Sequence, residues 1–319
     1  MIVVSGIQPS GRLHLGNYFG AIEKQIALQE GNECYYFIAN YHALTSVKDG
    51  QKLRDFTYEI AATYLALGLD KANLFKQSDV PEVTELAWIL SNLVNIGVMN
   101  RNHAFKEKSE KGISSSVGLY TYPVLMSADI LIYGAEIVPV GEDQIQHIEI
   151  ARDLCDSFNR EYKTDIFTKP EYSLALMSKI PGIDGQKMSK SYNNTIPIFT
   201  EPKELKKLIS SIVTTSVDYT KEPMPVNKDT IFTLYALMAN PKERQELKIN
   251  YEQNREFGYG HAKELLIQRI SDIFGPVKRD YDQLLKDKGK LDSVLKKGAN
   301  AARQKAQETM TKVKEVCGL

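Results

Sequence analysis

The sequence predicts an α/β protein in which a doubly wound parallel sheet is followed by an all-helical second part. Short β-type runs alternate with helical patterns through the first half of the chain. This alternation stops near Pro202, and the segments beyond it are all helical in pattern. Strands separated by helices are typical of parallel sheets, whose ligands bind beyond the carboxyl ends of the strands.

The first two strand–helix pairs lie before residue 70. Residues 2–5 read IVVS, and the glycine-bearing turn after them leads into an amphipathic stretch at about 17–29. CYYFIA at 34–39 is a second apolar β-type run. Residues 53–69 then carry apolar side chains every three or four positions, which predicts a helix.

Two further pairs complete the predicted sheet. NLFKQ at 73–77 is a short strand followed by a helix that ends near Asn95. Residues 117–133 are helical in pattern and mostly apolar, which indicates a buried helix. EIVPV at 136–140 predicts a fourth strand, and a helix over about 142–159 follows it.

Composition indicates an ordinary globular protein. An apolar content of 43% with 25% charged residues is typical of that class. No basic leader and no apolar run of about 18 residues is evident, so neither a signal peptide nor a membrane span is expected. The cysteines, Cys34, Cys155 and Cys317, are too scattered for a metal site or a disulfide framework. We therefore expect a reduced, cytoplasmic protein without structural zinc.

Charge is unevenly distributed although the formal net charge is zero. Residues 1–200 hold 18 Lys and Arg against 23 Asp and Glu, and residues 201–319 hold 22 against 17. An excess of five basic residues in the second part permits a polyanionic partner. It is equally compatible with solvated helix faces.

The turn after the first strand contains His14, Gly16 and Asn17. It has neither the Walker phosphate loop nor the GxGxxG dinucleotide fingerprint. If a helix begins near Leu15, His14 and Asn17 point to one side of its first turn. Gly16 would let a planar group lie against the backbone, because glycine has no Cβ. A glycine-rich turn with an incidental histidine is the simpler alternative.

A second segment, KMSKS at 187–191, lies where the α/β pattern gives way to the helical one. The glycines and asparagines around it do not favour a helix. Taken alone, the segment fits a solvated loop. Two lysines three positions apart could also bring positive charge to an anionic ligand.

Four motifs together carry a family resemblance. PSGRLHLGN at 9–17 resembles the HIGH signature of class I aminoacyl-tRNA synthetases, in the HxGN form of the tryptophan branch, and KMSKS matches their second signature. MSADILIY at 126–133 and GEDQIQHIEIARD at 141–153 resemble two further motifs of tryptophanyl-tRNA synthetases. The order and spacing also agree, so the resemblance to the bacterial members of this family covers essentially the whole chain.

This resemblance implies a reaction and its partners. L-tryptophan and MgATP would give tryptophanyl-adenylate and pyrophosphate, and the tryptophanyl group would then pass to the 3′ end of tRNA(Trp). The implied cofactors are ATP and the Mg²⁺ bound with its phosphates, with no zinc or iron–sulfur cluster. The family also implies a cytoplasmic homodimer. We expect a Rossmann-like catalytic domain over 1–190, to which helix 290–319 returns, and a helical anticodon-binding domain over 191–289.

The resemblance also assigns site residues. The catalytic group comprises His14, Asn17, Lys108, Lys187 and Lys190. ATP contacts are expected from Gln8, Pro9, Ser10, Gly16, Asn17, Gly141, Glu142, Asp143, Ile180, Lys187, Met188, Ser189, Lys190 and Ser191. Lysine ammonium groups suit the charge that accumulates on departing pyrophosphate, which requires cations rather than covalent chemistry from the protein.

Asp129 is the informative residue for the amino acid. It lies in an apolar helical stretch, where a carboxylate must find a partner. It could be a satisfied core residue, or it could accept the indole N–H, which is a donor only. The remaining residues assigned to tryptophan are Val4, Ser5, Gln8, His42, Tyr122, Met126, Val138, Val140 and Gln144.

Three alternatives remain beside this reading. Tyrosyl-tRNA synthetase is the sister family with nearly the same architecture, but GEDQ and Val4 favour tryptophan. A small-molecule nucleotidyltransferase would not need the complete KMSKS or a basic helical domain. An inactive RNA-binding relative would not need His14, Asp129 and both lysines intact.

Overall fold

The computed structural model describes residues 1–100, 116–174, 179–215, 218, 222–227, 229–254 and 256–319. The chain forms two compact units. The first comprises Met1–Arg12, Lys24–Ala175 and Leu284–Leu319, and the second comprises Leu13–Glu23 and Leu176–Gln283. Within the described ranges, no helix has both the length and the apolar character that a membrane crossing requires.

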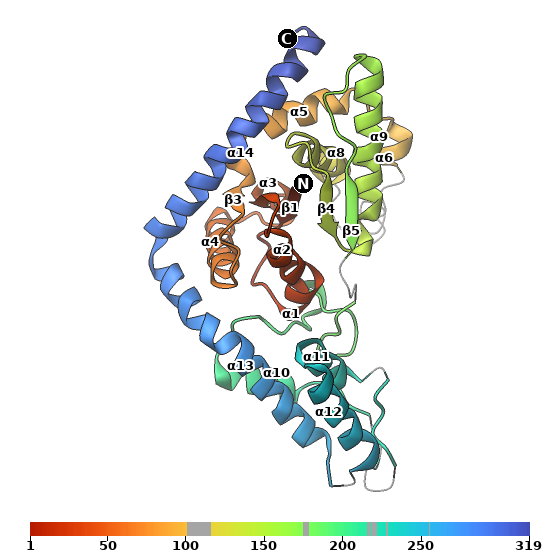
Figure 1. Cartoon of the computed structure of the whole chain (residues 1–319), viewed down its shortest axis with the longest axis vertical. Helices are drawn as coiled ribbons and strands as arrows, with labels where there is room; N and C mark the ends of the chain where they lie inside the picture. Colours follow the sequence, from red (N-terminus) through yellow and green to blue (C-terminus); the bar gives the residue numbers. More distant parts are fainter. Residues whose placement is uncertain (101–115, 175–178, 216–217, 219–221, 228, 255) are drawn as a thin grey trace. The chain divides into compact units, whose positions relative to one another are not determined.

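The first unit is built on a five-stranded parallel sheet with the order β3-β2-β1-β4-β5 (Figure 1). Its strands are β1 (Ile2–Ile7), β2 (Glu33–Ile38), β3 (Asn73–Lys76), β4 (Ile137–Val140) and β5 (Glu171–Leu174). The expected doubly wound α/β fold is confirmed. The chain leaves one edge at β3 and returns beside β1 at β4, so the strand order reverses between β1 and β4.

The helices of the first unit follow the strands. They are α2 (Glu23–Leu28), α3 (Asn40–Ala43), α4 (Gly50–Ala66), η2 (Gln77–Asp79), α5 (Glu82–Ser91), α6 (Ile96–Met99), α8 (Val117–Leu131), η3 (Glu142–Gln144), α9 (Ile145–Glu161) and α14 (Lys288–Cys317). Helix α4 begins earlier than the expected residue 53, because the Asp49 side chain caps it by accepting hydrogen bonds from the Gln51 and Lys52 amides.

The second unit is helical in its regular structure. Its elements are α1 (Leu15–Asn17), η1 (Tyr18–Ile22), η4 (Lys190–Tyr192), α10 (Pro202–Ser210), α11 (Thr230–Met238), α12 (Pro241–Gln253) and most of α13 (Tyr259–Lys286). Residues 13–23 therefore pack with the helical part, although they follow directly on the first strand of the sheet.

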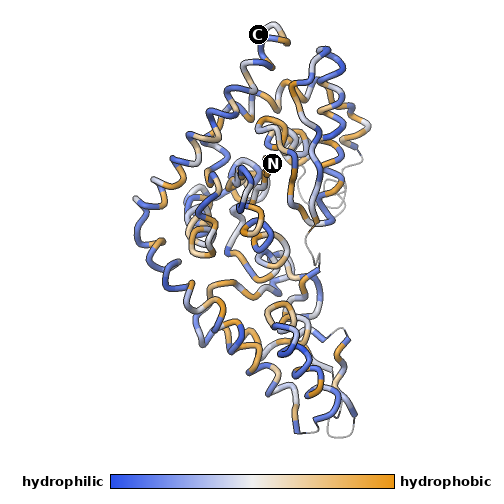
Figure 2. Tube along the Cα trace, in the orientation of Figure 1, coloured by the Kyte–Doolittle hydropathy of each residue, from blue (hydrophilic) through white to orange (hydrophobic). Residues whose placement is uncertain are grey.

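The core of the first unit lies on both faces of the sheet. All but the first residue of β2 are buried, and Tyr36, Phe75 and Phe158 are among the largest fully buried side chains. A parallel sheet is covered by helices on both sides, so its central strands are continuously apolar. Helices α9 and α14 instead alternate between hydrophobic and hydrophilic residues, as helices at a surface do (Figure 2).

Helix α14 packs closely along the edge strand β3. A Cβ at Gly298 would lie 2.0 Å from the Leu74 carbonyl oxygen, so only glycine fits at this crossing. Polar contacts add to it: Glu82 of α5 accepts hydrogen bonds from Arg303 at 2.9 Å and Gln307 at 3.0 Å. The edge of the sheet is thus covered by a helix that lies 212 or more residues further along the chain than the strand.

Gly298→Ala should lower the free energy of unfolding by about 1–3 kcal/mol, because the added methyl group overpacks the β3 crossing. Gly289→Ala on the same helix is the matched control. Its Cβ would meet nothing closer than 3.6 Å, so it should raise stability by about 0.5–1 kcal/mol. Urea unfolding followed by circular dichroism measures both. Equal effects of the two variants would contradict the close packing.

Candidate active site

The reversal of strand order places two turns of the first unit beside each other. Strands β1 and β4 are parallel neighbours, with Val3 opposite Ile137, so both carboxyl ends lie at one edge of the sheet. Gln8 and Ser10 follow β1 and form a tight turn with a hydrogen bond of 2.9 Å. Ligands of doubly wound sheets bind at this topological switch point.

The turn after β4 consists of three residues assigned to ATP. Gly141 precedes η3 in an extended conformation, and Glu142 and Asp143 form its first turn with exposed side chains. A Cβ at Gly141 would come within 2.9 Å of an Asp143 carboxylate oxygen. Glycine therefore lets the Asp143 side chain lie back against the turn. Pro9 is buried beside the corresponding turn after β1.

In the second unit, the start of α1 is joined to the strand-like segment after η4. The Leu15 amide donates to the Ile196 carbonyl at 2.9 Å, and the Ile198 amide donates to Leu13 at 3.0 Å. His14 is the N-cap residue, and its amide donates to the Asn17 side-chain oxygen at 3.1 Å. Asn17 thus has a structural role in this turn in addition to any contact with a ligand.

Gly16 and Met188 bring the two sequence signatures into contact within this unit. The Gly16 amide lies 3.3 Å from the Met188 sulfur, and the Met188 side chain is buried. A Cβ at Gly16 would be 2.9 Å from Nδ1 of His14 and 3.3 Å from Cβ of Met188. Any larger residue at this position would have to displace the His14 ring.

Asn194 holds the KMSKS segment in its conformation, and the sequence had not indicated it. This buried amide accepts a hydrogen bond from the Ser189 amide at 2.8 Å. It donates to the Lys187 carbonyl at 3.1 Å and to Asp184 at 2.8 Å. The Met188 amide also donates to the Ile180 carbonyl at 2.7 Å. One side chain therefore holds the backbone of the first half of the segment, at Lys187 and Ser189.

The two lysines of this segment differ in their surroundings. Lys187 is exposed, and Lys190 opens the short helix η4, whose N-cap is Ser189 and whose second residue is Ser191. Burial and the nearby Lys190 ammonium lower the pKa of His14 to about 4. Its imidazole is therefore neutral at pH 7. Its Nδ1 has no hydrogen-bond partner among the described residues.

A separate buried polar cluster surrounds Asp129 of α8 in the first unit. The carboxylate lies 2.7 Å from Nε2 of His42 and accepts two hydrogen bonds from Gln77, at 2.8 and 2.9 Å. Gln77 in turn accepts from the Tyr41 amide at 3.0 Å. Burial raises the pKa of Asp129, whereas the contacts to His42 and Gln77 oppose that rise.

Tyr122 lies about two turns of α8 before Asp129 and belongs to a second polar pair. Its hydroxyl lies 2.5 Å from Nε2 of His147 in α9, and its ring meets the His42 ring edge-on with 6.3 Å between centroids. Sequence reasoning did not single out Gln77 or His147. Neither residue has a clear signal in the sequence, because Gln77 stands between Lys76 and Ser78 and His147 follows Gln146, where a polar side chain is ordinary.

The other residues assigned to tryptophan lie in the first unit. Ser5 is buried and accepts a hydrogen bond from Gln25 at 2.7 Å. Val4 and Val138 are core residues, whereas Met126, Val140 and Gln144 are half-buried. Lys108 lies outside the described residues. Within the described ranges there is no group of three or more His, Cys, Asp or Glu side chains suited to a metal ion.

The lowered pKa of His14 makes stability depend on pH. Below about 6.5 the unfolded chain binds a proton at this residue that the folded chain does not, down to about pH 4. As the pH falls through this interval, the free energy of unfolding therefore decreases by about 1.4 kcal/mol per pH unit because of this histidine. His14→Gln should flatten the stability profile between pH 6.5 and 4 in urea titrations. The exposed His261→Gln is the control, and an equal flattening there would contradict the assignment.

Comparison with known proteins identifies the family of the chain. A model of the class I tRNA synthetases (W and Y) matches residues 1–275. The chain is 47% identical over 321 residues to the tryptophan–tRNA ligase of Rhodopirellula baltica, with 100% of both chains covered. It is also 47% identical over 322 residues to that of Campylobacter jejuni, again covering 100% of each.

Solved structures agree as well. The crystal structure of tryptophanyl-tRNA synthetase from Campylobacter jejuni complexed with ADP and tryptophan matches with a TM-score of 0.92 at 46% identity, covering 100% of each chain. A tyrosyl-tRNA synthetase from Archaeoglobus fulgidus shares the fold at 20% identity with a TM-score of 0.67, over 89% of this chain and 90% of that one. The chain belongs to the class I tRNA synthetases of the tryptophan and tyrosine family.

Proposed function

We propose that the chain is a tryptophan–tRNA ligase. It activates L-tryptophan with ATP and then transfers the tryptophanyl group to the 3′ end of tRNA(Trp). The observation that carries the proposal is the buried Asp129 carboxylate, held by His42 and Gln77. The indole N–H is a donor without acceptor capacity, so a fixed carboxylate suits it. Full-length relatives that are 47% identical bear the same activity in their names.

Tryptophan is favoured over tyrosine by the same cluster. A phenol both donates and accepts, whereas the indole nitrogen needs only an acceptor. A buried acceptor left without its indole partner disfavours phenylalanine by roughly 10⁴-fold or more. Such discrimination removes the need for an editing site. The remaining residues of the tryptophan site would be those named above, with half-buried Met126 and Val140 as apolar walls.

In the first step a carboxylate oxygen of tryptophan forms a bond to the α-phosphorus of ATP. The bond from that phosphorus to the bridging oxygen breaks, and pyrophosphate leaves with the negative charge. Lys187 and Lys190 would stabilise this charge, together with Lys108. Mg²⁺ bound to the phosphates would share it. Neutral His14 and the amide of Asn17 can donate hydrogen bonds to phosphate oxygens without a change of protonation near pH 7.

The ATP residues belong to both units. Gln8, Pro9, Ser10, Gly141, Glu142 and Asp143 are in the first, and Gly16, Asn17, Ile180 and 187–191 are in the second. Carboxylates such as Glu142 and Asp143 are suitable acceptors for ribose hydroxyl groups. In the second step the terminal adenosine hydroxyl of tRNA attacks the carbonyl carbon of the adenylate, and AMP leaves.

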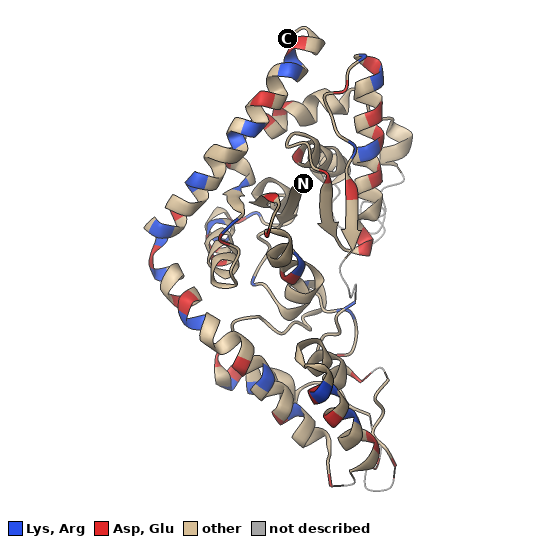
Figure 3. Cartoon of the chain, viewed as in Figure 1, with Lys and Arg blue, Asp and Glu red and all other residues tan. Residues whose placement is uncertain are grey.

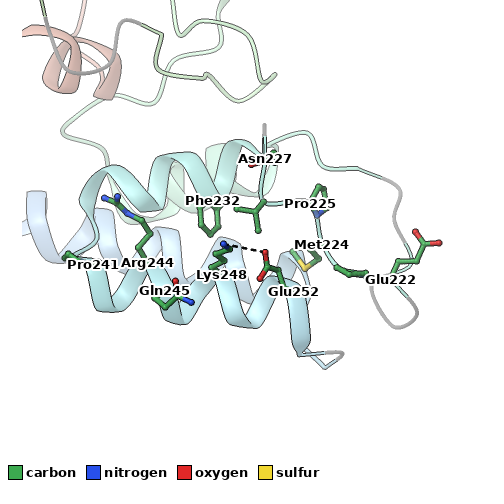
Figure 4. A pocket seen from close by; sticks show the side chains of 12 residues that line it. Glu222, Met224, Pro225, Asn227, Phe232, Pro241, Arg244, Gln245, Lys248 and Glu252 are labelled. Carbon is green, nitrogen blue, oxygen red and sulfur yellow. Dashed lines mark ion pairs between the residues drawn. The ribbon is translucent and has the colours of Figure 1, made fainter.

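The functional domains would be a Rossmann-like catalytic domain over 1–190 with helix 290–319, and an anticodon-binding domain over 191–289. A groove of about 960 Å³ in the second unit is a suitable surface for tRNA. Arg244, Gln245 and Lys248 of α12 line it, and the Phe232 side chain projects toward Lys248 from α11 (Figure 4). Amide and cationic donors beside an aromatic ring are the groups that bind unstacked RNA bases.

We also propose that the enzyme is a cytoplasmic homodimer. Trp88 of α5, Ile96 of α6 and Val117 of α8 are 73%, 70% and 77% exposed. Both α5 and α6 pack on α8, so these side chains belong to one part of the first unit. Large apolar groups on neighbouring elements indicate a surface that another protein covers. A second copy of the chain is the occupant that the family resemblance implies.

Tryptophan-dependent exchange between ATP and pyrophosphate tests the activity. Lys187→Ala and Lys190→Ala should each slow exchange by about 100-fold or more, because each removes a cation that stabilises the leaving group. Tryptophan affinity should change little. Lys179→Ala, an exposed lysine before the segment, is the control. Exchange with tyrosine alone would select the sister family, and no exchange with any amino acid would overturn the proposal.

Basic residues at 242–269 divide into two groups that tRNA binding should distinguish. Lys242 and Lys248 are exposed, whereas Lys263 donates to the Ser210 and Ile212 carbonyls at 2.7 and 2.9 Å. Lys242→Ala and Lys248→Ala should weaken tRNA(Trp) binding and lower its salt dependence by about one counterion each. Pyrophosphate exchange should be unaffected. Unchanged affinity across this series would refute the surface.

Trp88→Glu and Ile96→Glu should shift the protein toward monomer in sedimentation velocity experiments, because a buried carboxylate at an apolar interface is left without a partner. Val213→Glu replaces another exposed apolar residue, in the second unit, and should leave the dimer intact. A wild-type protein that sediments as a monomer at micromolar concentration would contradict the proposal.

A further inference from the structure

His147 has no role in the function proposed above, although it is as buried as His42. Its side chain is 4% exposed and extends from the first turns of α9, shortly after the GEDQ motif. We propose that His147 is a positioning residue that acts through the Tyr122 hydroxyl to build the site for the α-ammonium group of the amino acid. This inference rests on the proposed function and deepens it.

The direction of hydrogen bonding is the first argument. An ammonium group has only donors, so the oxygen that binds it must present a lone pair and place its own proton elsewhere. Tyr122 can meet this requirement because Nε2 of His147 lies 2.5 Å from its hydroxyl oxygen. With Nε2 as the acceptor, the hydroxyl proton points toward α9. A lone pair of the oxygen is then directed away from His147.

This arrangement requires a neutral imidazole, because a protonated one has no acceptor. Burial is the main cause that lowers the pKa of His147 to about 4. The charge of His42 on α3 lowers it further, whereas Asp143 on η3 opposes the shift. The ring therefore stays neutral throughout the pH range in which protein synthesis occurs.

A purely structural histidine would satisfy both ring nitrogens. Nδ1 of His147 is buried and has no hydrogen-bond partner among the described residues. Such an unmet polar atom costs roughly 1–3 kcal/mol. Leucine would fill a similar volume without that cost. The contact between Nε2 and Tyr122 is thus the feature that distinguishes histidine from an apolar residue here.

The test compares His147→Leu with His147→Gln, whose amide oxygen can still accept the Tyr122 proton. In pyrophosphate exchange, His147→Leu should raise the KM for tryptophan about tenfold, while kcat and the KM for ATP change less than threefold. His147→Gln should retain more of the tryptophan affinity. The exposed His261→Gln is the control and should match wild type.

Two inhibitors separate the ammonium site from the rest of the pocket. Tryptamine keeps the ammonium group, and indole-3-propionate lacks it. His147→Leu should weaken inhibition by tryptamine about tenfold and leave that by indole-3-propionate unchanged. In a double-mutant cycle, Tyr122→Phe/His147→Leu should be no worse than Tyr122→Phe alone.

Equal losses for both inhibitors, or additive effects in the cycle, would overturn the inference in favour of general damage to the pocket. If His147→Leu does not fold, Tyr122→Phe decides the matter with the same inhibitors. An equal loss of both in that variant would also overturn it. A wild-type protein that exchanges pyrophosphate only with other amino acids would instead refute the proposed function.

Discussion

A carboxylate placed inside an apolar core must be held by donors, and this constraint organises the sheet-bearing unit around Asp129. Its partners come from α3 and η2, which follow β2 and β3 respectively. Gln77 also accepts from the amide of Tyr41, so one side chain joins the ends of two strands to α8. The donors that stabilise the buried Asp129 carboxylate also fix the direction of its remaining lone pairs. One set of hydrogen bonds thus stabilises the buried charge and, in the function proposed above, also orients it toward the indole N–H.

In the second unit the charged group that acts on its neighbour is a cation, the ammonium group of Lys190. Lys190 is close enough to His14 to help hold its imidazole neutral. The KMSKS segment has little regular structure, yet Asn194 ties both Ser189 and Lys187. The backbone at Lys187 is therefore held by a side chain and not by a helix, whereas Lys190 begins the short helix η4. Figure 3 shows that α14 carries its lysines and arginines differently, at intervals along a long amphipathic helix.

The sequence predicted four of the five strands and most helices, because their apolar periodicity is strong. It missed β5, whose four residues EYSL are largely exposed at the sheet edge and lack a β-type apolar pattern. Asp129 was found because a carboxylate is anomalous within an apolar helix. Gln77, His147 and Asn194 were not, because their importance lies in partners that the fold brings together. For Gln77 that partner is 52 positions away in the chain.

The packing of Gly298 against Leu74 also affects the order in which parts of the protein can fold during synthesis. The first unit contains both Met1–Arg12 and Leu284–Leu319. A ribosome must therefore synthesise the whole helical unit before α14 can cover β3. Until then the sheet has an uncovered edge strand, which is a template for pairing with another chain. The helical unit is complete in sequence by that time and can fold first, so the first unit is completed last, when α14 packs on β3.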